Sequence, residues 1–202
     1  AAAARLAAIL LQASNVDPDI NSKEMDFYRT TVWFLNSIKD LGMTLTLMNS
    51  TVIDTIGGLR LAGRLPQKNA VFPSKIMELT SRIDSNKIAS SLTDLGKPSW
   101  ERDSYKVCLA SSIMEVGVDV PRLGLMAVMG QPKTVSQYIQ VTGRVGRSSD
   151  GPGLVFLLSH TGRARDRGVY EDFKYFHSSL YANVEPTSVT PFAIEAMNKG
   201  LK

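Results

Sequence analysis

The chain has 202 residues, of which 44% are hydrophobic, and 23 Lys and Arg against 19 Asp and Glu give it a net charge of +4. This length and composition suit a single globular domain with a sizeable core and exclude a disordered tail. The longest apolar runs fall short of the about 18 residues that a bilayer-spanning helix needs, and 1 Cys with 2 His cannot supply a structural zinc site, so the sequence argues against both classes.

The N-terminal part of the chain predicts a helix, a strand and a second helix. The Ala-rich opening favours a helix, and we expect residues 1–22 to form a helix and linker ahead of a domain over residues 23–202. Residues 31–35 form a short apolar run that is typical of a buried strand. Apolar residues then recur at helical spacing over residues 38–52, and the glycine pair at 57–58 is expected to end that helix.

Strands and helices alternate through the rest of the chain. The expected elements are a loop at 58–74, a strand at 75–80, a helix at 86–95, strands at 106–110 and 124–129, a helix from 135, a strand at 153–158 and a last helix with Val169, Phe173, Phe176 and Leu180 on one stripe. Apolar strands without alternation need cover on both faces, so the pattern predicts an α/β domain with a mainly parallel central sheet flanked by helices.

Side chains outside the motifs are expected to be structural. Cys108, inside the third strand, predicts a small core residue, and a lone Cys with no leader at the start favours a reducing, cytoplasmic setting. The two histidines, His160 and His177, are expected at the surface or at its boundary. For the aromatic residues of the last helix, core packing is favoured over a stacking surface; these are Tyr170, Phe173, Tyr175, Phe176 and Tyr181.

Positive charge gathers late in the chain. Between residues 144 and 167 lie five arginines against only Asp150 and Asp166. Guanidinium groups match phosphate oxygens, so this stretch favours a nucleotide or nucleic-acid partner, while a solvated face remains an equal alternative. Because ligands of parallel α/β sheets bind beyond the carboxyl ends of the strands, the candidate contacts are the polar residues there: Asn36-Ser37, Ser81-Arg82, Ser111-Ser112, Gly130-Gln131 and Ser159-His160.

Two motifs carry the most specific signal. They are ASSIMEVGVDVP from Ala110 to Pro121 and QVTGRVGR from Gln140 to Arg147. Both resemble motifs V and VI of superfamily 2 helicases, in the order and separation found in the second RecA-like domain of that family. The resemblance implies a RecA-like fold and a part in an ATP-dependent motor.

Arg144 and Arg147 are the candidate catalytic residues. Being three residues apart, they are expected to project from one side of a helix, with Gly143 and Gly146 leaving that side unobstructed. The resemblance implies that they are arginine fingers, which enter a cleft against ATP held by the first RecA-like domain and stabilise the transferring phosphoryl group. Surface salt bridges are the alternative role for the pair.

The resemblance also implies the other site residues. It implies nucleotide contacts at Gly117, Asp119, Gln140 and Gly143. In this interpretation Asp119 contacts the ribose or orients a motif VI arginine, and its alternative role is that of a turn residue before Pro121. Contacts to the nucleic-acid backbone fall on Asn36, Ser37, Ser81, Arg82 and Ser111, whose alternative roles are those of ordinary strand-end residues and caps.

A closer resemblance covers roughly residues 31–197. The run from Val118 to Met126, the segment from Gly130 to Thr134 and the tail with Ala164-Arg165-Asp166-Arg167 and residues 184–192 are similar to the helicases of DISARM phage-defence systems and their bacterial and archaeal relatives. This likeness implies DNA as the polymer in preference to RNA, an N-terminal RecA-like lobe in the same polypeptide, and protein subunits of a defence complex as further partners.

Departures from the family pattern limit what the chain does alone. Val141 stands where many relatives carry arginine, and Gln140 where others carry histidine. The chain also has neither a phosphate loop nor an acidic pair, which hold ATP and Mg²⁺ in such enzymes. We therefore expect this chain to need an N-terminal lobe for ATP hydrolysis. A non-catalytic helicase-like module that binds DNA or protein is the alternative.

Overall fold

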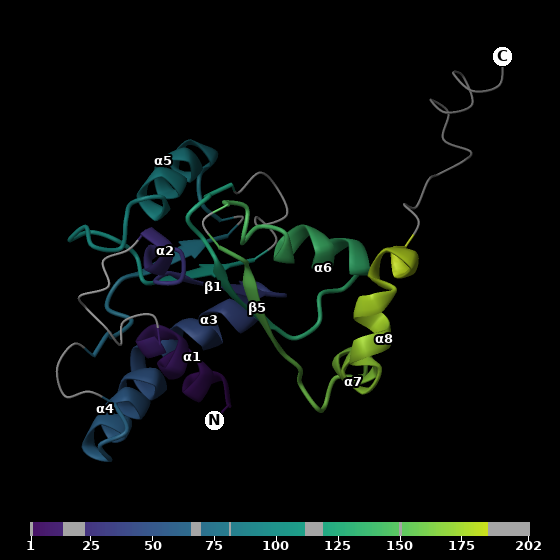
Figure 1. Ribbon diagram of the computed structural model, residues 1–202, viewed down its shortest axis with the longest axis horizontal. Coiled ribbons are helices and arrows are strands. Elements are labelled where there is room, and N and C mark those ends of the chain that lie inside the picture. The colour runs from purple at the N-terminus through teal and green to yellow at the C-terminus, as the bar shows by residue number, and fades with distance from the viewer. Residues whose placement is uncertain are drawn as a thin grey trace.

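The computed structural model describes residues 2–13, 23–65, 70–80, 82–111, 119–149 and 151–185. One parallel sheet of five strands in the order β2-β3-β1-β4-β5 forms its centre (Figure 1). The strands are β1 (Thr31–Leu35), β2 (Ile76–Leu79), β3 (Val107–Ala110), β4 (Leu125–Met129) and β5 (Leu154–Leu158). The predicted α/β fold with a parallel sheet is confirmed, and each of the five strands lies where the sequence predicts it.

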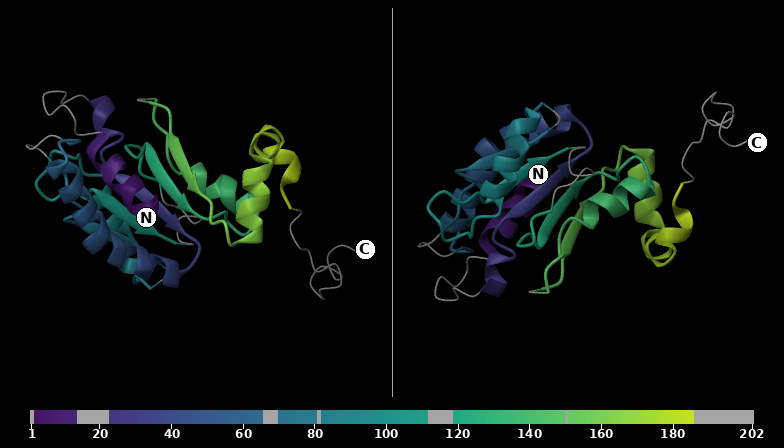
Figure 2. Two further views of the ribbon diagram at one scale, coloured as in Figure 1. Left: turned by 90° about the horizontal axis from the view of Figure 1, so that it is seen from below. Right: turned by 90° about the horizontal axis from the view of Figure 1, so that it is seen from above.

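Helices cover both faces of this sheet (Figure 2). One face packs against α1 (Ala2–Ala13), α3 (Ile38–Leu47), the π-helical η1 (Met48–Val52) and α4 (Ile53–Leu61). The other face packs against α5 (Ser85–Leu95) and α6 (Val135–Thr142). The short α2 (Lys23–Asp26) leads into β1. Cys108 is fully buried in β3, as the sequence predicts. None of the helices in the described ranges is long and apolar enough to cross a bilayer.

Helix α1 packs onto the core face. Its small residues Ala4, Ala7 and Ala8 are buried and let the helix approach the sheet closely. At its end, the Gln12 amide donates to the Val71 carbonyl at 2.6 Å and accepts from the Val71 amide at 3.1 Å. The proposed division of the chain after residue 22 stays a prediction.

The second helical run continues past the glycine pair. The expectation that Gly57 and Gly58 end this helix is wrong, because α3, η1 and α4 follow one another to Leu61. Ile56 is fully buried in the core beneath them, and its packing outweighs a glycine cost of about 1 kcal/mol per residue. The helix ends at Leu61, and Gly63, two residues on, turns the chain away with φ +67°.

The last predicted helix is broken into three pieces. They are α7 (Ala164–Glu171), α8 (Phe173–Ser178) and the 3₁₀ helix η3 (Leu180–Asn183). The expected core packing of its aromatic residues is wrong for four of them, since Tyr170, Phe173, Tyr175 and Tyr181 are 47–80% exposed. Phe176 alone of the five is half-buried, against the Tyr138 ring.

Strand β5 lies at one end of the sheet and is poorly covered. Leu154, Val155 and Phe156 are 46%, 36% and 37% exposed, although the first four strands are almost entirely buried at their apolar positions. Both faces of β5 are open here, because neighbouring residues of a strand point to opposite sides.

Candidate nucleotide and nucleic-acid interfaces

The predicted site residues separate into two groups at opposite edges of the sheet. The parallel register aligns the carboxyl ends of the five strands, so residues that follow a strand share one edge. The candidates at this carboxyl edge are Asn36, Ser37, Arg82 and Ser111. Those at the amino edge, close to the starts of β4 and β5, are Asp119, Arg144 and Arg147. Gly117 and Ser81 lie outside the described residues.

Arg144 and Arg147 lie on a loop and not on a helix. Helix α6 ends at Thr142, and the following Gly143 leaves helical geometry with ψ 4°. The expectation that both arginines project from one side of a helix is therefore wrong. Gly143 is exposed, and Arg144 is half-buried. The loop of residues 143–147 will be called the arginine loop.

Gly146 fixes the path of the arginine loop. Its φ is +73°, and a Cβ atom at this position would lie 2.5 Å from the Gly153 nitrogen. The Gly146 amide donates to the Leu123 carbonyl at 2.9 Å, just before β4 begins. Only glycine fits this crowded, left-handed position without strain, so the loop is held against the amino edge of the sheet.

Arg147 and Asp119 meet at this edge. The Arg147 Nη1 lies 3.3 Å from Asp119 Oδ2, and the Arg147 Nε donates to the Gly143 carbonyl at 2.8 Å. Their side chains remain 39% and 60% exposed. Gln140, on α6, is also exposed. The pair thus orients a guanidinium group and leaves both side chains accessible to a ligand.

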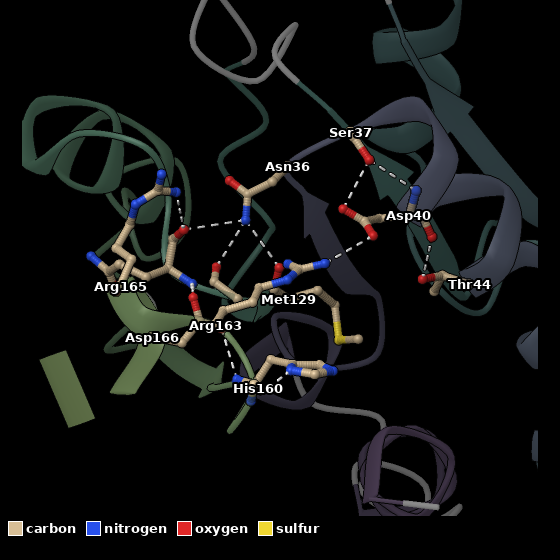
Figure 3. A network of polar contacts seen from close by, with 12 residues as sticks. Asn36, Ser37, Asp40, Thr44, Met129, His160, Arg163, Arg165 and Asp166 are labelled. Carbon is tan, nitrogen blue, oxygen red and sulfur yellow. Dashed lines mark hydrogen bonds and ion pairs between the residues drawn. The ribbon is translucent and has the colours of Figure 1, made fainter. Parts of the chain in front are cut away.

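At the carboxyl edge, Asn36 and Ser37 already have structural roles. The Asn36 amide donates to the carbonyls of Met129, Gly130 and Gln131 at 3.1, 3.1 and 3.4 Å (Figure 3). Ser37 caps α3, accepting from the Asp40 amide at 3.0 Å and donating to its carboxylate at 2.9 Å. Asn36 therefore joins the end of β1 to the turn after β4.

Arg82 and Ser111 differ in how accessible they are. Arg82 is exposed, and its backbone amide donates to Thr80 Oγ1 at 3.2 Å. Ser111 is only 3% exposed, and its amide donates to the Leu79 carbonyl at 3.1 Å. Its hydroxyl is buried without a hydrogen-bond partner among the described residues. Arg82 is thus the more accessible of these two candidate residues.

Sequence reasoning missed the carboxylate that organises this edge. Asp166 is 1% exposed, and its two oxygens accept from the amides of Gln131 at 3.0 Å and His160 at 2.7 Å (Figure 3). Nearby, Arg163 Nη2 pairs with Asp40 Oδ1 at 3.3 Å. The signal available was one aspartate among the three arginines of residues 163–167, since such a residue has to be paired if it is buried.

A second unforeseen contact is made by Glu185. Its carboxylate accepts from the Val135 amide at 3.0 and 2.9 Å and from the Ser136 amide at 3.4 Å, at the N-terminus of α6. These hydrogen bonds lower the pKa of Glu185. One turn further, Tyr138 Oη and His177 Nε2 lie 2.9 Å apart, and burial raises the pKa of Tyr138. The C-terminal segment thus contacts the helix that leads into the arginine loop.

A parallel α/β lobe that pairs a motif V aspartate with a motif VI arginine at one edge defines a RecA-like helicase lobe. The family model for the helicase conserved C-terminal domain matches residues 22–149. The chain belongs to this family and is the C-terminal domain of a superfamily 2 helicase.

Among curated proteins, the DISARM protein DrmA of Bacillus paralicheniformis is 39% identical over 199 residues. The match takes in 98% of this chain and 17% of DrmA. The chain therefore spans about a sixth of the length of that relative. A DNA 3′-5′ translocase, XPB2 of Sulfurisphaera tokodaii, is 38% identical over 60 residues, which are 30% of this chain and 14% of XPB2.

Solved structures agree on the fold. The DUF1998 helicase MrfA bound to DNA and AMPPNP matches with a TM-score of 0.63 at 14% identity, over 97% of this chain and 22% of that chain. The helicase Lhr of Mycobacterium smegmatis, bound to ssDNA and AMP-PNP, matches with a TM-score of 0.52 at 15% identity, over 80% and 18% of the two chains.

Proposed function

We propose that this chain is the C-terminal motor lobe of an ATP-dependent DNA helicase or translocase, with Arg144 and Arg147 as its arginine fingers. The observation that carries the proposal is the ion pair between Arg147 and Asp119 at an open edge of the sheet. A buried ion pair would have a structural role, whereas this exposed pair orients the Arg147 guanidinium group and leaves it accessible to a ligand.

ATP fits the side chains at the amino edge. Bound between this lobe and an N-terminal RecA-like lobe of the same polypeptide, it supplies the phosphoryl group whose transfer drives the motor. The arginine loop stabilises the charge that develops on that group, and Asp119 orients Arg147 toward it. Gly117, Gln140 and Gly143 complete the nucleotide contacts in this proposal.

Mg²⁺ is assigned to the N-terminal lobe. Within the described ranges, no group of three or more His, Cys, Asp or Glu side chains could hold a metal ion. In phosphoryl-transfer motors, the metal is bound by the phosphate loop and by an acidic residue. We place both of these, and the residues that bind the triphosphate, in the N-terminal lobe.

The carboxyl edge holds DNA in the same proposal. Arg82 contacts a backbone phosphate directly, while Asn36, Ser37, Ser81 and Ser111 shape the edge beside it. We propose DNA over RNA on the resemblance to the DISARM helicases, and MrfA, which shares the fold, was solved with DNA. Subunits of a defence complex are further partners by the likeness to DrmA, and the proposed setting is the cytoplasm.

The test compares three proteins. The 202-residue chain alone is expected to show no ATPase activity, and the polypeptide that also contains the N-terminal lobe is expected to show activity that DNA stimulates. Arg147→Ala in that polypeptide should lower kcat by about 10³ to 10⁵. The exposed Arg102→Ala is the control. ATP hydrolysis by the isolated chain, or full activity of Arg147→Ala, contradicts the proposal.

One observation favours the alternative of a non-catalytic binding module. Val141, which replaces an arginine of many relatives, is fully buried in the core. The side chain at this position therefore packs against the sheet and contacts no nucleotide. If the longer polypeptide binds DNA but never hydrolyses ATP under any condition that saturates it with both ligands, the module is the correct interpretation.

A further inference from the structure

A cavity of about 390 Å³ opens at the carboxyl edge, between the turn after β4 and the turn after β5. Gln131 and Lys133 line it from the first turn, Arg163 lines it from the end of the second turn, and Arg165 lines it from the start of α7. None of these four residues belongs to the stretches that resemble motifs V and VI, 110–121 and 140–147. Its volume is within the range of about 300 to 1,000 Å³ that is usual for small-molecule sites.

The charges around this cavity favour an anion. Lys133, Arg163 and Arg165 line it against one carboxylate, that of Asp166. Both oxygens of Asp166 already accept backbone amides, so this carboxylate is occupied. In the part of the chain that the structure describes, the Lys133 and Arg165 side chains make no ion pair, and Arg165 has one long hydrogen bond, of 3.4 Å to the Gln131 carbonyl. Two cations thus remain for an external anion.

Two residues that line this cavity, Gln131 and Asn36, each carry a buried acceptor that needs a donor. Gln131 is 3% exposed, and its side-chain oxygen Oε1 has no hydrogen-bond partner among the described residues. The same is true of Asn36 Oδ1, on the neighbouring strand end. An unsatisfied buried acceptor is costly, so a ligand that fills this cavity should donate hydrogen bonds in addition to carrying negative charge. A nucleotide offers both, through its phosphate and its base.

The position of the cavity extends the proposed DNA track. In the sheet order β2-β3-β1-β4-β5, the candidate contacts Arg82, Ser111 and Ser37 follow β2, β3 and β1. The cavity lies after β4 and β5, the next two strands in that order. With neighbouring strands about 4.8 Å apart, a nucleic-acid strand that crosses all five covers about 19 Å.

We propose that this cavity binds one nucleotide of single-stranded DNA, with its phosphate between Lys133 and Arg165 and its base donating to Gln131. The inference rests on the proposed function, since it lengthens the DNA contact of the carboxyl edge. It adds a DNA-binding site beside the candidate contacts Ser37, Arg82 and Ser111, at the end of the sheet where β5 lies. Arg163, tied to Asp40, holds the wall of the cavity in place.

The test measures binding of a labelled single-stranded oligonucleotide of mixed sequence by fluorescence anisotropy, using the full polypeptide that contains this chain. The double variant Lys133→Gln/Arg165→Gln should weaken binding about tenfold at low salt and reduce the slope of log K against log salt by about 0.7, because the neutralisation of one phosphate is lost. The matched control Lys97→Gln/Arg102→Gln removes the same charge near the opposite edge and should leave that slope unchanged.

A second variant isolates the base contact. Gln131→Met removes the buried acceptor, so it should weaken binding of the mixed-sequence strand without lowering the melting temperature. On an abasic strand with the same phosphates, Gln131→Met should bind as well as the unchanged protein, while the double variant should still bind more weakly. If Gln131→Met only raises the melting temperature and binding is unaffected, the cavity holds no base.

Failure of this inference is distinguishable from failure of the proposed function. If Arg82→Gln weakens DNA binding and the double variant does not, the carboxyl edge binds DNA but the cavity takes no part. If the unchanged protein binds no DNA at all, the proposed function itself is wrong.

Discussion

Arg147 Nη1 and Asp119 Oδ2 lie 3.3 Å apart, although 27 residues, 120–146, lie between them in the chain. The arginine loop brings the two side chains together at the start of β4 and β5. The pair joins the two motifs that the sequence singles out. Since both side chains stay accessible, a change in either one should affect chemistry more than it affects the stability of the fold.

Asp119→Asn tests this separation of roles. We expect the melting temperature of the full polypeptide to change little, because an exposed ion pair contributes about 0.2 to 1 kcal/mol. The ATPase kcat should fall by up to about 10²-fold, because Arg147 is no longer oriented. The double variant Asp119→Asn/Arg147→Ala should be no slower than Arg147→Ala alone. Additive losses would show that the two residues act independently, and Glu101→Gln is the control for removing an exposed carboxylate.

Gly146→Ala should distort the arginine loop. The alanine Cβ would lie 2.5 Å from the Gly153 nitrogen, and the left-handed backbone adds a penalty of about 1 to 2 kcal/mol. We expect a lower free energy of unfolding in urea and a loss of ATPase activity in the full polypeptide. Gly57→Ala is the matched control, because nothing lies within 4 Å of its Cβ position. In α4 it should stabilise the protein by about 0.5 to 1 kcal/mol. Equal effects of the two changes would refute the assigned role of Gly146.

The contact between Glu185 and the N-terminus of α6 should make the stability of the protein depend on pH. Its pKa is lowered in the folded protein by hydrogen bonds from the Val135 and Ser136 amides, so its contribution is complete above the ordinary pKa of a glutamate. That contribution is lost as the pH falls through the lowered pKa of the folded state. Thermal melts from about pH 6 down to about pH 3 should show a smaller loss of stability for Glu185→Gln than for the unchanged protein. An unchanged pH profile would contradict the contact.

Cys108 should be unreactive in the native state. Burial raises the pKa of its thiol to about 12, so almost no thiolate exists at neutral pH. A thiol reagent added to the native chain should label this residue only as fast as the core opens, and should label it at once in urea. Its labelling rate should therefore rise with urea together with the loss of tertiary structure. Rapid labelling in buffer would mean that β3 is exposed.

The sequence predicts the sheet well and the site only in part. Apolar runs such as 31–35 and 106–110 identify strands because burial on both faces leaves no polar alternation. The glycine pair at 57–58 misled, since local propensity is weaker than the packing of Ile56 beneath it. The breaks in the last helix were likewise not predicted, because the helical spacing of apolar residues was applied to the segment as one continuous helix.

The spacing of residues along the sequence could not predict contacts between segments that are distant in the chain. Arg147 and Asp119 were both candidates, yet their pairing follows from how the arginine loop turns at Gly146. Asp166 and Glu185 lie in runs that resemble the DISARM helicases, but their contacts could not be predicted, because their partners are backbone amides that any sequence provides. When a carboxylate accepts hydrogen bonds from backbone amides, the partner can be any residue type, so the sequence shows no paired residue that would predict the contact.

The open strand β5 has a practical consequence for work with this lobe. An unprotected sheet edge with apolar side chains on both faces is a template for pairing with another copy. When the lobe is produced by itself, concentrated samples should therefore oligomerise through Leu154, Val155 and Phe156, and charged replacements at these positions should keep it monomeric.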